Sequence, residues 1–148
     1  MATVANAESS ACLFCRIVSG DAAAATVLAE PDVVGFLDVN PVFLGHVLVV
    51  PRVHYDTLTD VPADGLAPLF GQVQRVARAV VSAMGAQGTF VAMNNVVSQS
   101  VPHLHVHVVP RTKGDGLRGF FWPRHKYPSE DVMADVAARI RAELHETA

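Results

Sequence analysis

The chain has 148 residues, of which 51% are hydrophobic and 17% charged, enough apolar material for one packed domain. Eleven Lys and Arg against fourteen Asp and Glu give a net charge of -3, which excludes the broad basic surface that binding of a nucleic-acid polymer requires. No apolar run reaches the roughly eighteen residues of a transmembrane helix, and the first basic residue, Arg16, comes too late to begin a signal peptide. We therefore expect a cytoplasmic protein that does not contact a membrane.

The first third of the chain is predicted to hold a tail, a short helix and three strands. Residues 1–10 have small side chains without a periodic apolar pattern, which predicts a disordered N-terminus before a single domain over residues 11–148. Apolar residues at helical spacing predict one or two helical turns at 13–18. Segments rich in β-branched residues and bounded by turn residues predict strands at 26–30, 33–38 and 45–50, arranged as a β-meander.

The rest of the chain is predicted to add two main helices and two strands. Residues 64–85 repeat their apolar side chains at helical spacing, and residues 129–144 do the same behind Ser129, which we expect to cap that helix. Residues 88–94 and 103–109 read as strands. Five strands with two main helices predict an α+β fold in which helices pack on a sheet.

The strongest chemical signal is the alternation of histidine with apolar residues at 103–109, HLHVHVV. Successive side chains of a strand point to opposite faces, so His103, His105 and His107 are predicted to share one face, about 7 Å apart. Imidazole titrates near neutrality and can attack, exchange a proton or bind a metal. A polar outer face of the sheet that happens to use histidine is the simpler alternative.

This segment resembles the signature of the histidine triad (HIT) family, which is His-φ-His-φ-His-φ-φ with φ apolar. The resemblance extends to CLFCRIVSG at 12–20, FLDVNP at 36–41, GHVLVVPRVH at 45–54 and QSVPH at 99–103. It implies a HIT-like five-stranded antiparallel sheet that is extended across a homodimer. It also implies a site on the sheet for an AMP-like or GMP-like purine nucleotide, cleaved at the α-phosphate.

The resemblance implies a role for each histidine that matches the family pattern. His105 matches the nucleophile that forms a nucleotidyl-histidine intermediate, and His107 matches the residue that stabilises phosphate charge or helps to protonate the leaving group. His46 matches a fourth histidine that supports them; from the sequence alone it could equally be a core histidine with a hydrogen-bond partner.

The resemblance also implies a set of substrate contacts. Asp38 matches the residue that accepts hydrogen bonds from the ribose hydroxyls, and Ser100, Gln99 and Asn95 match residues near the phosphate, although the loop at 94–98 is short and lacks glycine. The remaining candidates are three residues for the base, which periodicity alone would assign to the core, and one contact to the leaving group, which could equally be a surface anchor: Phe14, Ile17, Phe36 and Trp122.

The cysteine pair Cys12 and Cys15 has the spacing of half a zinc site, of a redox pair or of two thiols in an apolar helix. A redox pair is disfavoured because a thioredoxin-like βαβ context is missing. The chain resembles the zinc-carrying, bacterial Hint-like branch of the family, which implies that His54 and His103 complete one structural zinc site per chain.

The sequence leaves rival functions open. The first is a phosphoramidase or related nucleotide hydrolase, and the second is a dinucleoside polyphosphate hydrolase of the Fhit-like kind. A nucleotide-binding regulatory module with little turnover is the third. A catalytic zinc held by all three triad histidines is disfavoured, because side chains about 7 Å apart along a strand converge poorly on one ion.

Overall fold

The computed structural model describes residues 11–118 and 124–146. The chain divides into two compact units, Met1–Asp115 and Gly116–Ala148. The first carries the sheet and the candidate site, and the second carries one helix. The single domain expected over residues 11–148 stays a prediction, and the disordered N-terminus expected at 1–10 lies outside the described residues.

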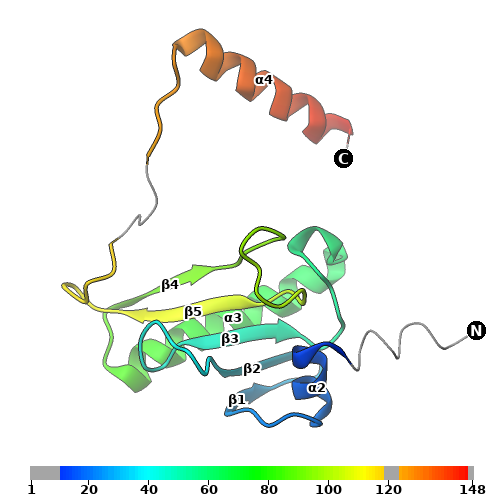
Figure 1. Ribbon diagram of the computed structural model, residues 1–148, viewed down its shortest axis with the longest axis vertical. Helices are drawn as coiled ribbons and strands as arrows, with labels where there is room; N and C mark the ends of the chain where they lie inside the picture. The colour runs from blue at the N-terminus through cyan, green and yellow to red at the C-terminus, as the bar shows by residue number, and fades with distance from the viewer. Residues whose placement is uncertain (1–10, 119–123, 147–148) are drawn as a thin grey trace, which may run out of the picture. The chain divides into compact units, whose positions relative to one another are not determined.

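The first unit is built on one antiparallel sheet of five strands, β1-β2-β3-β5-β4 in spatial order (Figure 1). The strands are β1 (Thr26–Ala29), β2 (Val33–Leu37), β3 (Val47–Pro51), β4 (Gly88–Ala92) and β5 (Val106–Arg111). The β-meander predicted for the first three strands is confirmed, and so is the α+β fold with five strands. The last strand in the chain, β5, lies between β3 and β4 and pairs with both.

The strand predicted at residues 103–109 begins later than expected, at Val106. Only His107 of the three triad histidines therefore lies in the sheet, and the predicted strand start at residue 103 is wrong. The rings of His103 and His105 both contact Phe14, and that of His105 also contacts His107, so the predicted sharing of one face is confirmed. The backbone N–H of Leu104 donates to the carbonyl of Tyr55 at 2.7 Å, outside the sheet ladder. The neighbouring strand β3 ends at Pro51, which has no N–H to extend the ladder.

One face of the sheet is covered by the long helix α3 (Ala63–Met84). The predicted alternation holds here, because Leu104, Val106 and Val108 point to this face and are fully buried in one cluster with α3. The helix ends at Gly85, whose φ of 62° suits glycine at a helix C-terminus. This core fixes the strand that carries His107.

The opposite face carries the short helix α2 (Leu13–Ser19) and the candidate site (Figure 1). A smaller apolar cluster joins Phe14 of α2 to side chains of β2 and β3, namely Val34, Phe36, Leu48 and Val50. Cys12 caps α2 and Gly20, with a φ of 88°, ends it. One face of the sheet therefore carries the main core, and the other carries the smaller cluster beside the candidate site.

The second unit holds α4 (Glu130–Glu146). The Ser129 hydroxyl accepts from the backbone N–H of Val132 at 3.2 Å, which confirms the predicted cap. Among the helices of residues 11–118 and 124–146, none is both long and apolar enough to cross a membrane.

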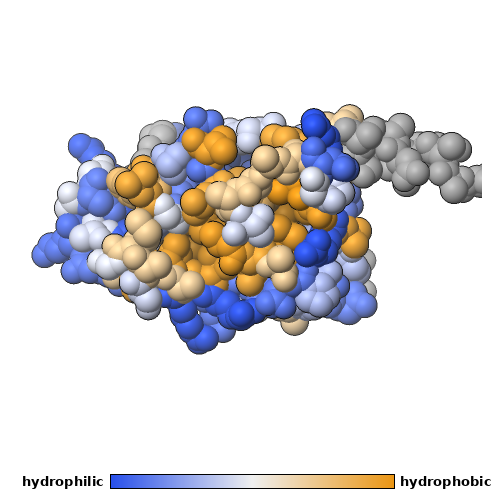
Figure 2. Space-filling view, turned by 90° about the horizontal axis from the view of Figure 1, so that it is seen from below, coloured by the Kyte–Doolittle hydropathy of each residue, from blue (hydrophilic) through white to orange (hydrophobic). Residues whose placement is uncertain are grey.

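The face viewed in Figure 2 has apolar side chains at its centre and polar ones around them.

Candidate functional site

Two histidines, one just before β3 and one on β5, are in contact at the site. His46 directly precedes β3, and its Nε2 lies 2.9 Å from Nδ1 of His107 on β5. The backbone N–H of Val42 donates to Nδ1 of His46 at 3.1 Å, so this nitrogen is an acceptor and Nε2 carries the proton of the neutral ring. His46 therefore donates to His107, which leaves the His107 proton on Nε2.

His105 is oriented by the backbone. Its Nδ1 lies 2.8 Å from the carbonyl oxygen of His103, which can only accept, so Nδ1 carries a proton. In the neutral ring the lone pair is then on Nε2. His105 is 3% exposed, and its ring centroid lies 5.0 Å from that of His107. The geometry gives a lone pair on one histidine beside an N–H donor on the next.

Burial keeps the supporting histidines neutral. Burial lowers the pKa of His107 to about 4; the nearby rings of His105 and His46 lower it further, and Asp38 opposes them. Burial also lowers the pKa of His46, against the attraction of Asp38, whose Oδ2 lies 3.7 Å from Nε2 of His46. Both rings are neutral at pH 7, which preserves the chain of donors described above.

The residues expected to bind the nucleoside lie next to these histidines. The rings of Phe14 and His105 meet edge to face with centroids 5.1 Å apart, and Phe14 also contacts Phe36 at 5.3 Å. Ile17 packs on the same cluster. One carboxylate oxygen of Asp38 accepts from the backbone N–H of Asn40 at 2.8 Å, and the other faces His46. Their roles toward base and ribose stay predictions.

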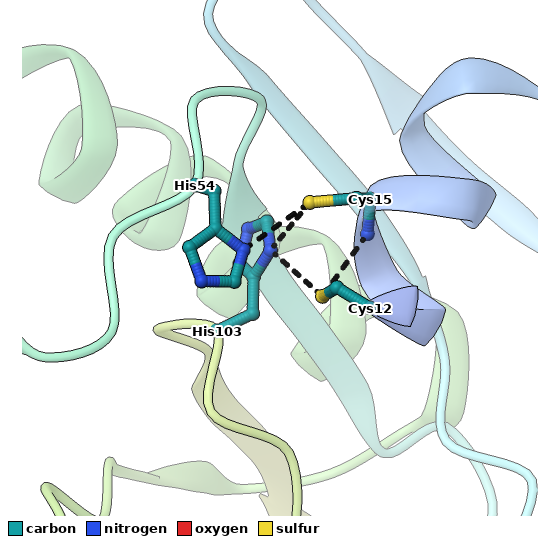
Figure 3. Close-up of side chains that lie close together, drawn as sticks. All are labelled: Cys12, Cys15, His54 and His103. Carbon is teal, nitrogen blue, oxygen red and sulfur yellow. Dashed lines mark hydrogen bonds between the residues drawn. The ribbon is translucent and has the colours of Figure 1, made fainter. Parts of the chain in front are cut away.

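The four predicted metal ligands lie together (Figure 3). Nδ1 of His103 is 3.5 Å from the sulfurs of both Cys12 and Cys15, and Nδ1 of His54 is 3.2 Å from the sulfur of Cys15. All four ligand atoms lie within 4.8 Å of one another. A tetrahedral zinc ion with ordinary bond lengths separates a sulfur from a nitrogen ligand by about 3.6 Å. The cluster therefore fits zinc in its donor set and spacing.

The protons of this cluster are also placed for a metal. Nε2 of His103 donates to the carbonyl of Pro51 at 2.9 Å, and Nε2 of His54 donates to the carboxylate of Asp56 at 2.8 Å. In neutral rings both Nδ1 atoms are then unprotonated, and both face the cysteines. Burial, the main cause, lowers the pKa of His103 to about 4, and the backbone N–H of Cys15 donates to the sulfur of Cys12.

The triad is therefore divided between two clusters of donor atoms. Among the described residues, one group of possible ligands is Cys12, Cys15, His54 and His103, and the other is Asp38, His46 and His107. His103 faces the cysteines, so the three triad histidines do not converge on one ion. This arrangement argues against the catalytic zinc cage considered from the sequence.

A cleft of about 770 Å³ adjoins the metal cluster and is lined in part by Cys12, His54, Asp56 and Ser100. His105 and His107 are not among its lining residues. Ser100 is an exposed residue of this lining. This cleft thus borders Ser100, which is predicted to lie near the phosphate, and His105 does not line it.

The other two residues predicted near the phosphate make contacts within the chain. The side-chain amide of Gln99 contacts the backbone at both of its polar ends, at Val96 and at Asp56. The side-chain oxygen of Asn95 accepts from the backbone N–H of Leu58 at 2.8 Å. Trp122 lies outside the described residues.

Sequence reasoning missed two groups that orient the histidines. Asp56 follows the metal-ligand candidate His54 by two residues and accepts a hydrogen bond from its ring. A carboxylate so close in sequence to a histidine ligand could have been predicted to orient that ring. The backbone N–H of Val42 sets the proton on His46, and a backbone group leaves no signal in the sequence.

The chain is similar to known proteins in both sequence and fold. The family model described as "HIT domain" matches residues 19–114. A crystal structure from Streptococcus mutans UA159 superimposes with a TM-score of 0.83 at 34% identity, covering 90% of this chain and 85% of that one. A structure described as a Zn-bound histidine triad family protein, from Mycobacterium smegmatis, has a TM-score of 0.71 and 35% identity over 95% and 99% of the two chains. An adenosine 5'-monophosphoramidase of Schizosaccharomyces pombe is 27% identical over 135 residues, 88% of this chain and 98% of that protein.

Proposed function

The chain belongs to the HIT family, and on that premise we propose that it cleaves purine nucleoside phosphoramidates, or related mononucleotide derivatives, at the α-phosphate. The observation that carries the proposal is the fixed proton on Nδ1 of His105, which leaves the Nε2 lone pair for attack on phosphorus. The similarity to a monophosphoramidase supports the substrate class.

The proposed reaction has two displacements at phosphorus. In the first, Nε2 of His105 bonds to the α-phosphorus and the bond to the leaving amine breaks, and the amine takes a proton from solvent. In the second, a water oxygen bonds to phosphorus, the bond to Nε2 breaks with its electron pair returning to the ring, and a water proton is released to solvent. The carbonyl of His103 holds the Nδ1 proton throughout and stabilises the cationic ring of the intermediate.

The pair of His107 and His46 supports this reaction as a fixed donor. His107 presents Nε2–H while its Nδ1 accepts from His46, and His46 in turn accepts from the backbone N–H of Val42. The amide of Val42 cannot replace a proton that His46 gives up, so His46 cannot resupply His107 after His107 has lost its own proton. We therefore assign His107 to stabilising charge on a phosphate oxygen rather than to protonating the leaving group.

We also propose that one structural zinc ion per chain is held by the Cys12, Cys15, His54 and His103 cluster. When bound, the ion supplies a cross-link between α2 and the segments around His54 and His103, with no open position for water. The Zn-bound relative supports this assignment. Metal analysis of protein purified without chelator checks it, and the absence of zinc would contradict it.

We propose that the chain acts in the cytoplasm as a homodimer whose sheet continues from one protomer to the other. The strand β4 lies at the edge of the sheet, and its Val91 is 42% exposed. An edge strand with an exposed apolar side chain is suited to pairing with a second copy. Sedimentation at equilibrium would show twice the mass of one chain, and a monomer at micromolar concentration would contradict the proposal.

The test of the activity compares two substrates and two variants. Wild type should hydrolyse adenosine phosphoramidate faster than diadenosine polyphosphate, and His105→Ala should lose turnover by about a thousandfold or more while still binding AMP. His125→Ala, which changes an exposed histidine of the second unit, is the matched control. Preference for the dinucleotide would favour the Fhit-like alternative. Nucleotide binding without His105-dependent turnover would favour a regulatory module.

A further inference from the structure

The loop at 94–100, which joins β4 to the triad, is held in a strained conformation. Val96 has a φ of 67° and Ser98 a φ of 59°, and they are the non-glycine residues with positive φ in the described chain. This region is unfavourable for any residue other than glycine, and especially for one with a β-branched side chain. Such a loop keeps its shape only where its surroundings hold it.

The side chain of Gln99 spans the loop and its neighbour. Its Oε1 accepts from the backbone N–H of Val96, the strained residue, at 2.9 Å. Its Nε2 donates to the backbone carbonyl of Asp56 at 2.6 Å, forty-three residues away in the chain. The amide thus fixes the strained turn and ties it to another segment with one side chain.

A second hydrogen bond links the same two segments. The side-chain oxygen of Asn95 accepts from the backbone N–H of Leu58 at 2.8 Å. Both ties end on the segment at 54–58, so the loop at 94–100 is bound to it at two points.

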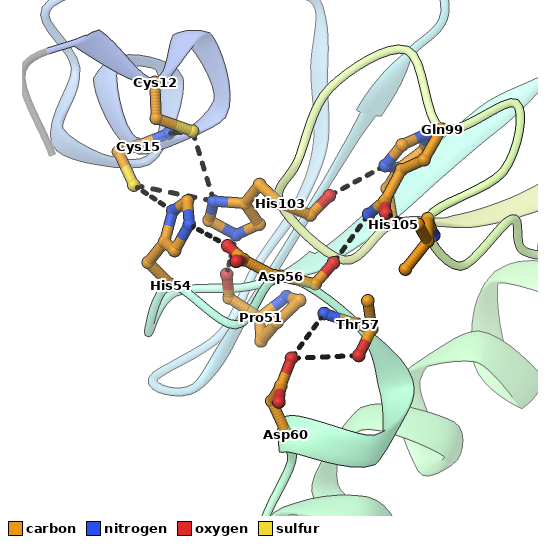
Figure 4. Close-up of polar contacts among 11 residues, drawn as sticks. Cys12, Cys15, Pro51, His54, Asp56, Thr57, Asp60, Gln99, His103 and His105 are labelled. Carbon is orange, nitrogen blue, oxygen red and sulfur yellow. Dashed lines mark hydrogen bonds and ion pairs between the residues drawn. The ribbon is translucent and has the colours of Figure 1, made fainter. Parts of the chain in front are cut away.

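The segment at 54–58 is itself anchored on the site. The carboxylate of Asp56 accepts from Nε2 of the metal-ligand candidate His54, and the carbonyl of Tyr55 accepts from the backbone N–H of Leu104, between two triad histidines. Figure 4 follows the contacts from the cysteines through His54 and Asp56 to Gln99. The chain of contacts joins the metal cluster to the loop that precedes the triad.

We propose that Gln99 is a positioning residue that holds the loop at 94–100, with the adjacent Ser100, in the conformation that receives the phosphate. The inference rests on the proposed function and deepens it, since it assigns Gln99 to shaping the loop and not to binding the phosphate. Both polar ends of the Gln99 side chain are already engaged within the chain. The segment at 54–58 is the fixed support against which the loop is held.

The test removes the amide while keeping the length of the side chain. Gln99→Met should lower kcat for adenosine phosphoramidate by about tenfold or more, with KM changed by less than about threefold, because the loop is misplaced in the transition state. Backbone hydrogen exchange of the peptide at 94–100 should become about tenfold faster, since its hydrogen bond and its support are lost. Gln74→Met, the same change on an exposed position of α3, is the matched control and should alter neither.

A second variant separates a strained loop from a lost phosphate contact. Glycine tolerates positive φ, so Val96→Gly in the Gln99→Met background should recover kcat by about fivefold. A loss of kcat in Gln99→Met without faster exchange, or without recovery by the glycine, would place Gln99 on the phosphate and overturn the proposal. If wild type lacks His105-dependent turnover, the proposed function fails, and unchanged exchange in Gln99→Met would separately refute the holding of the loop.

Discussion

The depressed pKa of His107 predicts that this one side chain makes folding sensitive to acid. Its pKa is about 4 in the folded chain against an ordinary value of 6.5. Between these values the unfolded chain binds more protons at this site than the folded chain does, so stability rises with pH and falls as pH drops through the window. At pH 5 the unfolded histidine is largely protonated and the folded one is neutral.

The size of the effect follows from the two values. Lowering the pH from 7 to 5 should remove about 2 kcal/mol from the free energy of unfolding through His107 alone. Below about pH 4 both states are protonated and the loss levels off. Burial is the main cause of the shift, and the rings of His105 and His46 add to it.

The assay compares wild type with His107→Asn. The asparagine oxygen takes the place of Nδ1 as acceptor for His46, so the hydrogen bond is kept while the titrating group is removed. Urea unfolding followed by circular dichroism at pH 7, 6 and 5 gives the free energies, and contributions from His46 and His103 are common to both proteins. The difference in the free energy of unfolding between the two proteins should change by about 2 kcal/mol from pH 7 to pH 5, because wild type loses more stability. Parallel curves would refute the reasoning.

Three further predictions concern the metal, a glycine and the ribose. Chelation should destabilise wild type by about 4 kcal/mol where free zinc stood a thousandfold above its Kd, and should leave the stability of Cys15→Ser unchanged; equal responses in thermal unfolding would contradict the zinc cluster. Gly45→Ala should lower the free energy of unfolding by about 2 kcal/mol or more, because φ is +94° and the new Cβ would lie 2.6 Å from Cγ of Met84. The control Gly20→Ala has a similar φ of +88° but no atom within 4 Å of the new Cβ, so its free energy of unfolding should fall less. Equal losses in urea unfolding would rule out the clash with Met84. Asp38→Ala, which removes the acceptor oxygens, should weaken AMP binding by about tenfold and remove the preference over 2'-deoxy AMP in calorimetry, and a preference that survives would contradict the role of Asp38 at the ribose.

The local elements followed from local patterns. The spacing of apolar residues predicts α3 within one residue of its observed ends, and Ser129 predicts the start of α4. Burial of Leu104, Val106 and Val108 on the α3 face follows from their alternation. These features depend on neighbours in the chain, so a short window of sequence contains the information.

The backbone groups that set the proton positions at the site could not be identified in the same way. The proton on His105 is set by the carbonyl of His103, and that on His46 by an N–H four residues earlier. Backbone groups are present at every residue, so the sequence does not tell which of them faces a ring. The ties from Gln99 and Asn95 are hidden for a similar reason, since each ends on a backbone atom far along the chain.

The sequence by itself determined which side chains could do the chemistry: the alternating histidines, the cysteine pair and the apolar residues that support them. The tertiary structure decided which of these side chains join the metal cluster and which join the pair of His46 and His107. Because β5 enters the sheet between β3 and β4, His107 meets His46 sixty-one residues away, and because the strand starts only at Val106, His103 is free to turn to the cysteines. Strand order and strand ends result from contacts across the whole sheet, and the local spacing of apolar residues does not reveal those contacts.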